Sequence, residues 1–130
     1  MIRILSITYK DSTAGGPYRV AIDHKNSLEK KNFNIKFFNN KSNLISGYIF
    51  NKKRIKKFIN KFDLIHVHNL FSVRSMIILK LAELLSIPSI LSVHGNLNDW
   101  SMKKNYTKKI LFLKFFKKNI NSVSLIHFLN

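Results

Sequence analysis

One histidine stands where a reactive side chain is expected in a parallel sheet. His94 ends the apolar run that starts at Ser89, and Gly95 follows it directly. A neutral imidazole at the end of a strand can hydrogen-bond a sugar or polarise a leaving group. Further along, Asp99 offers a hydrogen-bond acceptor and Trp100 a stacking surface. We therefore take His94 as the candidate catalytic residue.

A pair of glycines, Gly15 and Gly16, lies between the first apolar run and a helical pattern. Backbone N–H groups in such a loop, together with the helix N-terminus, can hold a phosphate oxygen. The pair belongs neither to a G-x-G-x-x-G fingerprint nor to a P-loop with its lysine. A tight turn that binds no ligand explains the dipeptide equally well.

Two further histidines, His66 and His68, alternate with Ile65 and Val67, so both side chains point to the same face of a strand. This spacing suggests a metal pair. A third ligand with suitable spacing is missing, however, and the acidic residues are scattered, so we expect no metal and a packed or hydrogen-bonded His66. No Ser-His-Asp order, nucleophile elbow or carboxylate pair is present, which argues against hydrolase chemistry.

Strands alternate with helices along the chain, which favours a parallel sheet with crossover helices. We predict one α/β domain over residues 1–130, a doubly wound, Rossmann-like parallel sheet. Its functional loops should follow the strands, beginning at Tyr9, His68, His94 and Asn130. The expected strands span residues 2–8, 33–38, 62–68, 89–94 and 123–129, with a weaker edge strand at 44–50, and the expected helices span 18–31, 52–60, 72–85 and 101–119.

The charge is strongly positive, with 23 Lys and Arg against 6 Asp and Glu and a formal net charge of +17. Such a balance favours phosphate-bearing partners, although Lys, Asn, Ile and Phe codons are also A/T-rich, so mutational bias explains part of it. The absence of cysteine excludes disulfides. No apolar run is long enough to span a bilayer, so we expect a cytoplasmic protein whose membrane contact, if any, is peripheral.

The segment from Ser101 to Asn119 carries many lysines without an acidic residue among them. Docking on an anionic membrane and a plain solvated face are equally good interpretations. No recognition helix, zinc spacing or stacking motif supports nucleic-acid binding, which remains the weaker alternative. The expected membrane contacts are Lys103, Lys104, Lys108, Lys109, Lys117 and Lys118, and the expected inward stripe is Tyr106, Ile110, Leu113, Phe116 and Ile120.

Four segments in this order form a familiar combination. They are Gly15-Gly-Pro-Tyr-Arg19, Asp63-Leu-Ile-His-Val-His-Asn69, Ile87-Pro-Ser-Ile-Leu-Ser-Val-His-Gly-Asn-Leu-Asn-Asp-Trp100 and Ser124-Leu-Ile-His-Phe128. Together they resemble the amino-terminal domain of GT-B glycosyltransferases of family 4. The resemblance covers almost the whole chain, and the stretch from Ile87 to the basic segment is its most specific part.

This resemblance implies a retaining, metal-independent transferase with two Rossmann-like domains. It would transfer a sugar from a nucleotide-sugar to a glycan or lipid-linked acceptor in cell-surface polysaccharide assembly, without another cofactor. By the resemblance, Gly15 and Gly16 approach the donor diphosphate and His94 lies beside the transferred sugar. The residues matched to the cleft or acceptor side are Arg19, Asn69, Gly95, Asn96, Asp99 and Trp100.

Two departures from the family pattern bear on activity. Pro17 removes one backbone donor from the glycine loop, and the acidic motif that clamps the donor has no counterpart here. We expect the carboxyl-terminal donor domain to be absent, the sheet to end uncovered after Asn130, and the chain alone to be inactive. The alternative is a non-catalytic subunit or remnant that binds an anionic membrane or a separate partner chain.

Overall fold

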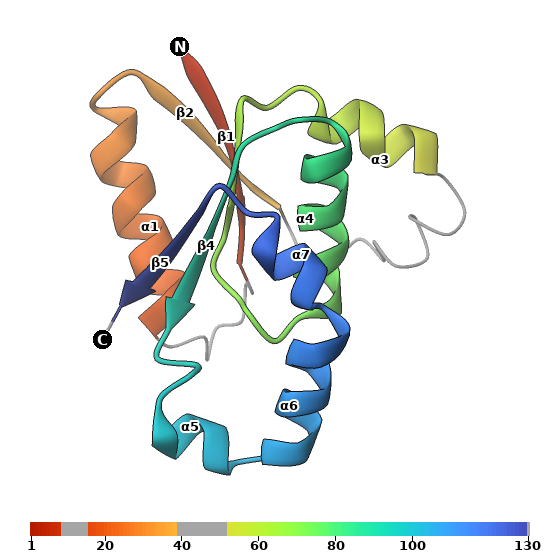
Figure 1. Cartoon of the computed structure of the whole chain (residues 1–130). Helices are drawn as coiled ribbons and strands as arrows, with labels where there is room; N and C mark the ends of the chain where they lie inside the picture. The colour runs from red at the N-terminus through yellow and green to blue at the C-terminus, as the bar shows by residue number, and fades with distance from the viewer. Residues whose placement is uncertain (9–15, 39–51, 130) are drawn as a thin grey trace.

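The computed structural model describes residues 1–8, 16–38 and 52–129. Within these ranges, parallel strands form one sheet in the order β2-β1-β3-β4-β5 (Figure 1). The predicted Rossmann-like α/β architecture is therefore confirmed. The strands are β1 (Ile2–Ile7), β2 (Phe33–Phe38), β3 (Leu64–Val67), β4 (Ser89–His94) and β5 (Leu125–Leu129), and the helices are α1 (Gly16–Glu29), α3 (Lys52–Ile59), α4 (Val73–Leu84), α5 (Asp99–Lys103), α6 (Tyr106–Phe115) and α7 (Lys117–Asn121).

The strand order reverses between β1 and β3. The chain leaves β1 for β2 on one side of it and returns to place β3 on the other side. Because all the pairings are parallel, the carboxyl ends of the strands lie along one edge of the sheet. We call it the carboxyl edge. Ligands of doubly wound sheets bind at this edge, beside the point of reversal.

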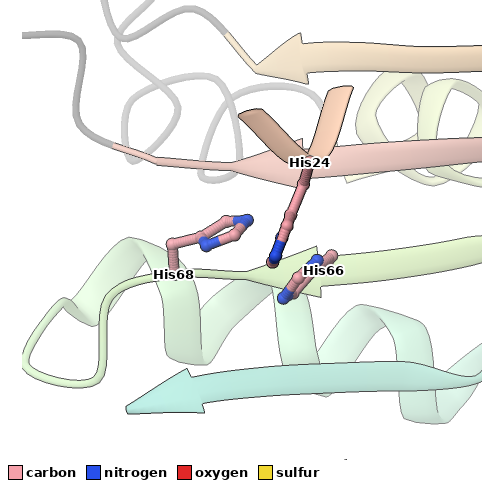
Figure 2. Close-up of side chains that lie close together, drawn as sticks. All are labelled: His24, His66 and His68. Carbon is pink, nitrogen blue, oxygen red and sulfur yellow. The ribbon is translucent and has the colours of Figure 1, made fainter. Parts of the chain in front are cut away.

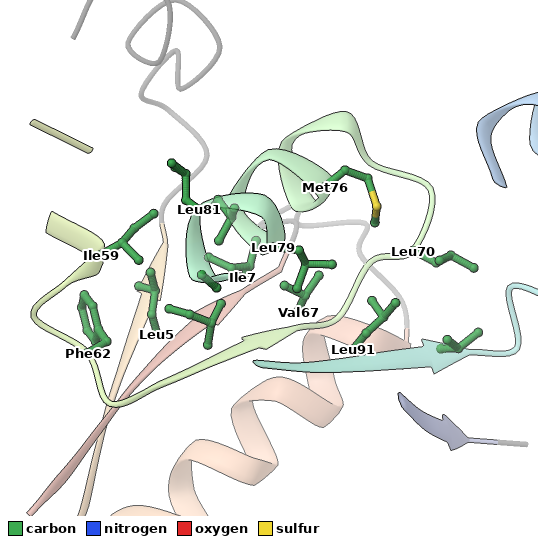
Figure 3. Close-up of a cluster of buried hydrophobic side chains, with 14 residues drawn as sticks. Leu5, Ile7, Ile59, Phe62, Val67, Leu70, Met76, Leu79, Leu81 and Leu91 are labelled. Carbon is green, nitrogen blue, oxygen red and sulfur yellow. The ribbon is translucent and has the colours of Figure 1, made fainter. Parts of the chain in front are cut away.

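One face of the sheet bears the hydrophobic core. Alternate residues of the central strands, among them Leu5, Ile65 and Leu91, are fully buried there. Figure 3 shows these side chains between the strands and α4, with α1 on the opposite side of the sheet. Each fully buried aliphatic side chain contributes about 1.5–3 kcal/mol, so this face supplies most of the packing that holds the carboxyl edge in place.

Helix α4 is apolar almost all round, as its sequence indicates, because the sheet and other helices cover it. Met76 and Leu81 are fully buried, while partly buried residues of α3, α6 and α7 pack against the same core. The Ser72 hydroxyl accepts from the N–H of Ser75 and caps the first turn. The helix ends before Ser86, whose positive φ of 54° turns the chain toward β4.

The predicted long helix over residues 101–119 is wrong in one respect, because the structure divides this segment into α5, α6 and α7. The break before α6 lies at Asn105, which adopts a left-handed backbone with φ 61°, a conformation that asparagine tolerates better than most residues. Tyr106, expected on the inward stripe, is 59% exposed. Phe112, which was not expected there, packs against the core together with Leu113.

Two predicted features lie outside the described residues: the edge strand at 44–50 and the loop from Tyr9 to Gly15. None of the helices in the described part of the chain is long and apolar enough to cross a bilayer.

Candidate functional site

The face of the sheet that packs under α1 carries polar side chains toward the carboxyl edge, whereas the opposite face is apolar there. Because side chains alternate along a strand, the residues between the core positions Ile65, Val67, Leu91 and Val93 point to this second face. They include His66 and His68 on β3 and just after it, Ser92 and His94 on β4, and His127 on β5.

Helix α1 adds a further imidazole. The ring of His24 lies 5.8 Å from that of His66 and 6.1 Å from that of His68, measured between centroids. Figure 2 shows it reaching down from α1 between these two rings. The chain contains five histidines, and this cluster therefore includes all of them; we call it the histidine cluster.

Hydrogen bonds organise the histidine cluster in two chains. Nε2 of His66 lies 2.8 Å from the Ser92 hydroxyl, which lies 3.3 Å from Nδ1 of His127. Separately, Nδ1 of His68 lies 3.2 Å from Nε2 of His94, and the two rings stack with centroids 5.4 Å apart. The contact with His68 fixes the orientation of His94 and engages its Nε2.

Burial keeps the inner imidazoles neutral. It lowers the pKa of His66 to about 4, with further lowering by the positive charge that His24, His127 and His94 can carry. Burial lowers the pKa of His68 to about 2, and the neighbouring imidazoles act in the same direction. The pKa of His94 is also lowered, again mainly by burial. Near neutral pH this edge therefore presents uncharged rings that can donate and accept hydrogen bonds.

The turn after β4 presents His94 at the carboxyl edge. Gly95 has φ +61°, and an added Cβ would lie 3.3 Å from Nδ2 of Asn98, so glycine suits the turn. The N–H of Asn98 donates to the Gly95 carbonyl, and the Asn98 side chain caps α5 by accepting from the N–H of Ser101. His94 and Asn96 are half-buried.

The other candidate residues lie at the same edge with different exposure. Asp99 is exposed at the start of α5, and Trp100 is 83% exposed without ring contacts in the described part of the chain. Gly16 is the first residue of α1, with open space around its Cα, and Arg19 is exposed one turn later. Gly15 lies outside the described residues.

A small cavity opens where β1 and β3 end, beside the point of strand reversal. Asn69, Thr8 and Arg74 line it, with apolar walls from Ile7 and Phe38. Nε and Nη1 of Arg74 are buried and find no hydrogen-bond partner among the described residues, and neither does the Thr8 hydroxyl. A buried guanidinium in this state has donors available for an anionic group.

The family follows from comparison with known proteins. Residues 12–127 match the family described as Glycosyltransferase Family 4, which is most of the chain. The chain belongs to glycosyltransferase family 4. No curated protein matches this family 4 domain significantly. A solved structure titled Trypanosoma brucei CTPS, glutaminase domain with bound acivicin, is 17% identical with a TM-score of 0.48, and the match covers 71% of this chain and 36% of that one.

Sequence reasoning located only part of the site of this family 4 domain. It placed His66 and His68 on one face and His94 at a strand end, as the structure has them. No third ligand stands at a suitable spacing in the sequence, but in the structure His24, which lies 42 residues before His66, comes close to these two through the packing of α1. Ser92 and His127 were also missed. Their alternation with the apolar residues Val93 and Ile126 could have placed them on the polar face of the sheet.

Helices α5 and α6 carry both exposed apolar side chains and exposed lysines. Trp100, Leu111 and Phe115 are 83%, 61% and 81% exposed. Lys109 is set apart, because its Nζ donates to the Ser101 carbonyl and lies 5.1 Å above the Phe71 ring. The exposed lysines on and beside these helices are Lys103, Lys104, Lys108, Lys114, Lys117 and Lys118.

Proposed function

We propose that this family 4 domain is the acceptor-side half of a retaining GT-B glycosyltransferase. It would take part in transferring a sugar from a nucleotide-sugar to a glycan or lipid-linked acceptor in the assembly of cell-surface polysaccharide. The family match supports sugar transfer in general. The observation that supports the site is the position of His94, at the carboxyl end of β4 and held through Nε2 by His68.

In this proposal His94 lies beside the transferred sugar. Because burial lowers its pKa, the ring is neutral near pH 7 and can hydrogen-bond a sugar hydroxyl without carrying a charge. Since His68 engages Nε2, Nδ1 is the nitrogen that would meet the substrate. Gly15 and Gly16 would approach the donor diphosphate, because α1 begins at the same edge and its N-terminus favours an anion.

The acceptor would lie along the turn that follows His94. Asn96 and Asp99 offer hydrogen-bonding groups, and exposed Trp100 offers a flat apolar surface on which a sugar ring can stack. Arg19 and Asn69 would form the opposite side of the cleft, with Arg74 available for an acidic group of the acceptor.

The GT-B architecture of this proposal pairs an acceptor-side with a donor-side domain, so the test includes both. The chain is combined with the carboxyl-terminal domain of another family 4 glycosyltransferase, and nucleotide release is measured for a panel of nucleotide-sugars and lipid-linked acceptors. We expect His94→Ala to lower kcat about 100-fold, while His127→Ala, on the same sheet face, keeps most activity. Equal turnover by the His94 variant and the unaltered chain would refute the role of His94.

We also propose that α5 and α6 place the domain on the cytoplasmic face of an anionic membrane. Exposed Trp100, Leu111 and Phe115 would enter the headgroup region while the neighbouring lysines meet the lipid charge. This would bring the carboxyl edge close to a lipid-linked acceptor. Since Lys109 is directed toward Ser101, we leave it out of this surface.

Cosedimentation with vesicles tests this surface directly. Each lysine near an anionic membrane contributes about 1 kcal/mol, so replacing Lys104 and Lys108 by Gln should weaken binding roughly 30-fold. The charge-matched control replaces Lys30 and Lys31, which are exposed at the end of α1. Equal loss in both double variants would indicate attraction by net charge alone and would contradict a specific docking face.

A non-catalytic subunit that completes the cleft of a separate partner chain is the second candidate. If no donor half restores nucleotide release, yet the chain copurifies with a partner that contains the acidic motif, this candidate replaces the first.

A further inference from the structure

The histidine cluster contains a second arrangement besides the contact between His68 and His94. His24, His66 and His68 each offer one ring nitrogen, and these three nitrogens lie within 4.8 Å of one another. His66 lies on β3 and His68 directly follows this strand, with both rings on one face of the sheet, and His24 approaches from α1 above them (Figure 2). Three imidazoles that converge from two elements are the donor set of many zinc sites.

We propose that His24, His66 and His68 bind a divalent transition metal ion, Zn²⁺ in the first place. Imidazole donors suit zinc, copper and nickel, whereas the hard ions Mg²⁺ and Ca²⁺ require oxygen ligands. Three protein ligands leave the fourth tetrahedral position to water or to an anion. The inference does not depend on the proposed sugar transfer.

The distances are close to those that zinc requires. At a Zn–N distance of about 2.0–2.1 Å, the nitrogens of a tetrahedral site lie about 3.3 Å apart. The three ring nitrogens of His24, His66 and His68 lie within 4.8 Å of one another, so the longest of their separations needs to shorten by no more than about 1.5 Å. Rotation of the His24 side chain can supply this change. The rings of His66 and His68 are already close, with centroids 4.0 Å apart.

The hydrogen bonds around the cluster match those of a metal site. Histidines that bind metal nearly always donate their other ring N–H to a neighbouring acceptor, which fixes the tautomer. Here Nε2 of His66 can donate to the Ser92 hydroxyl, and Nδ1 of His68 can donate to Nε2 of His94. In these tautomers the metal would take Nδ1 of His66 and Nε2 of His68.

The test measures zinc binding to the whole chain after removal of metal with a chelator. Calorimetry should detect one Zn²⁺ per chain, and Co²⁺ at the same site should give visible absorption that Zn²⁺ abolishes. Because changes around metal ligands already cost 10–100-fold in affinity, loss of a ligand in His24→Gln should weaken binding at least about 100-fold. The matched control is His127→Gln, which removes a cluster histidine that is not a ligand and should keep most of the affinity.

A second measurement keeps the inference testable if the His24 variant does not fold. In the unaltered chain, Zn²⁺ should shift the imidazole NMR signals of His24, His66 and His68 together, at one equivalent. Zinc that binds while these signals stay unmoved, or affinity that His24→Gln leaves unchanged, would overturn the proposed site. So would the absence of any binding at micromolar zinc.

Discussion

Mild acid should destabilise this domain through two buried histidines, His66 and His68. Their folded-state pKa values are about 4 and about 2 because burial disfavours the charged ring, whereas the unfolded chain titrates near 6.5. Below pH 6.5 the unfolded state therefore binds more protons than the folded state. The free energy of unfolding must then fall as the pH falls.

The size of the effect follows from the same values. Between pH 6.5 and 5.0 an unfolded histidine gains about 1.6 kcal/mol from protonation that its folded counterpart does not gain, so the two residues together lower the free energy of unfolding by about 3 kcal/mol. Asp63 does not contribute in this range. Hydrogen bonds from Arg3 lower its pKa to about 2, so its stabilisation is lost only between about pH 4 and pH 2.

Urea unfolding followed by circular dichroism at pH 6.5 and 5.0, with chelator present to exclude metal, measures this difference. His66→Gln retains a polar side chain beside Ser92 but does not titrate, so it should remove about half of the pH dependence. Ser92→Ala is the matched control, because it removes a hydrogen-bond partner and leaves both buried rings in place. A free energy of unfolding that stays constant over this range would refute the assignment of His66 and His68 as neutral buried groups.

Four substitutions away from the rings test a turn, a helix cap and a buried side chain. Gly95→Ala should lower the free energy of unfolding by about 1–2 kcal/mol because the turn needs φ +61°. Gly16→Ala is the control and should change this free energy little, because the added methyl group meets open space. Equal effects of the two substitutions in chemical denaturation would contradict the turn geometry. Ser72→Ala should cost about 1 kcal/mol through loss of the α4 cap, measured as a shift of the urea midpoint. Arg74→Met should leave the melting temperature unchanged or raise it, since two guanidinium nitrogens are buried without partners among the described residues; a clear drop would show that the arginine is satisfied in solution.

The fold was predictable because its determinants are local. Apolar runs of about six residues alternate with helical patterns, and the Ser72 cap and Pro88 delimit α4 in the sequence itself. The position of His94 followed from the same reasoning, since a residue at the end of a parallel strand must reach the carboxyl edge. The division of residues 101–119 into α5, α6 and α7 could not be predicted in this way, because it depends on the left-handed backbone of Asn105 and on the packing of Phe112 against the core.

The histidine cluster shows where sequence reasoning stops. His66 and His68 share a face by alternation, which a strand pattern reveals. His24 joins them only when α1 folds back over β3, and no spacing along the chain encodes that contact. The hydrogen bond between His68 and His94 likewise joins two strands whose register is set by the tertiary structure.

The most direct test of the proposed function asks whether sugar reaches His94. The chain labelled with ¹⁵N is titrated to millimolar concentrations with a panel of nucleotide-sugars and acceptor oligosaccharides, while the imidazole signals of His94 and the backbone signals of Gly95 and Asn96 are followed. We expect at least one ligand to shift these signals together and to leave those of α3, at the other side of the domain, unmoved. Ligand-induced shifts confined to other surfaces, with His94 unaffected throughout, would contradict it.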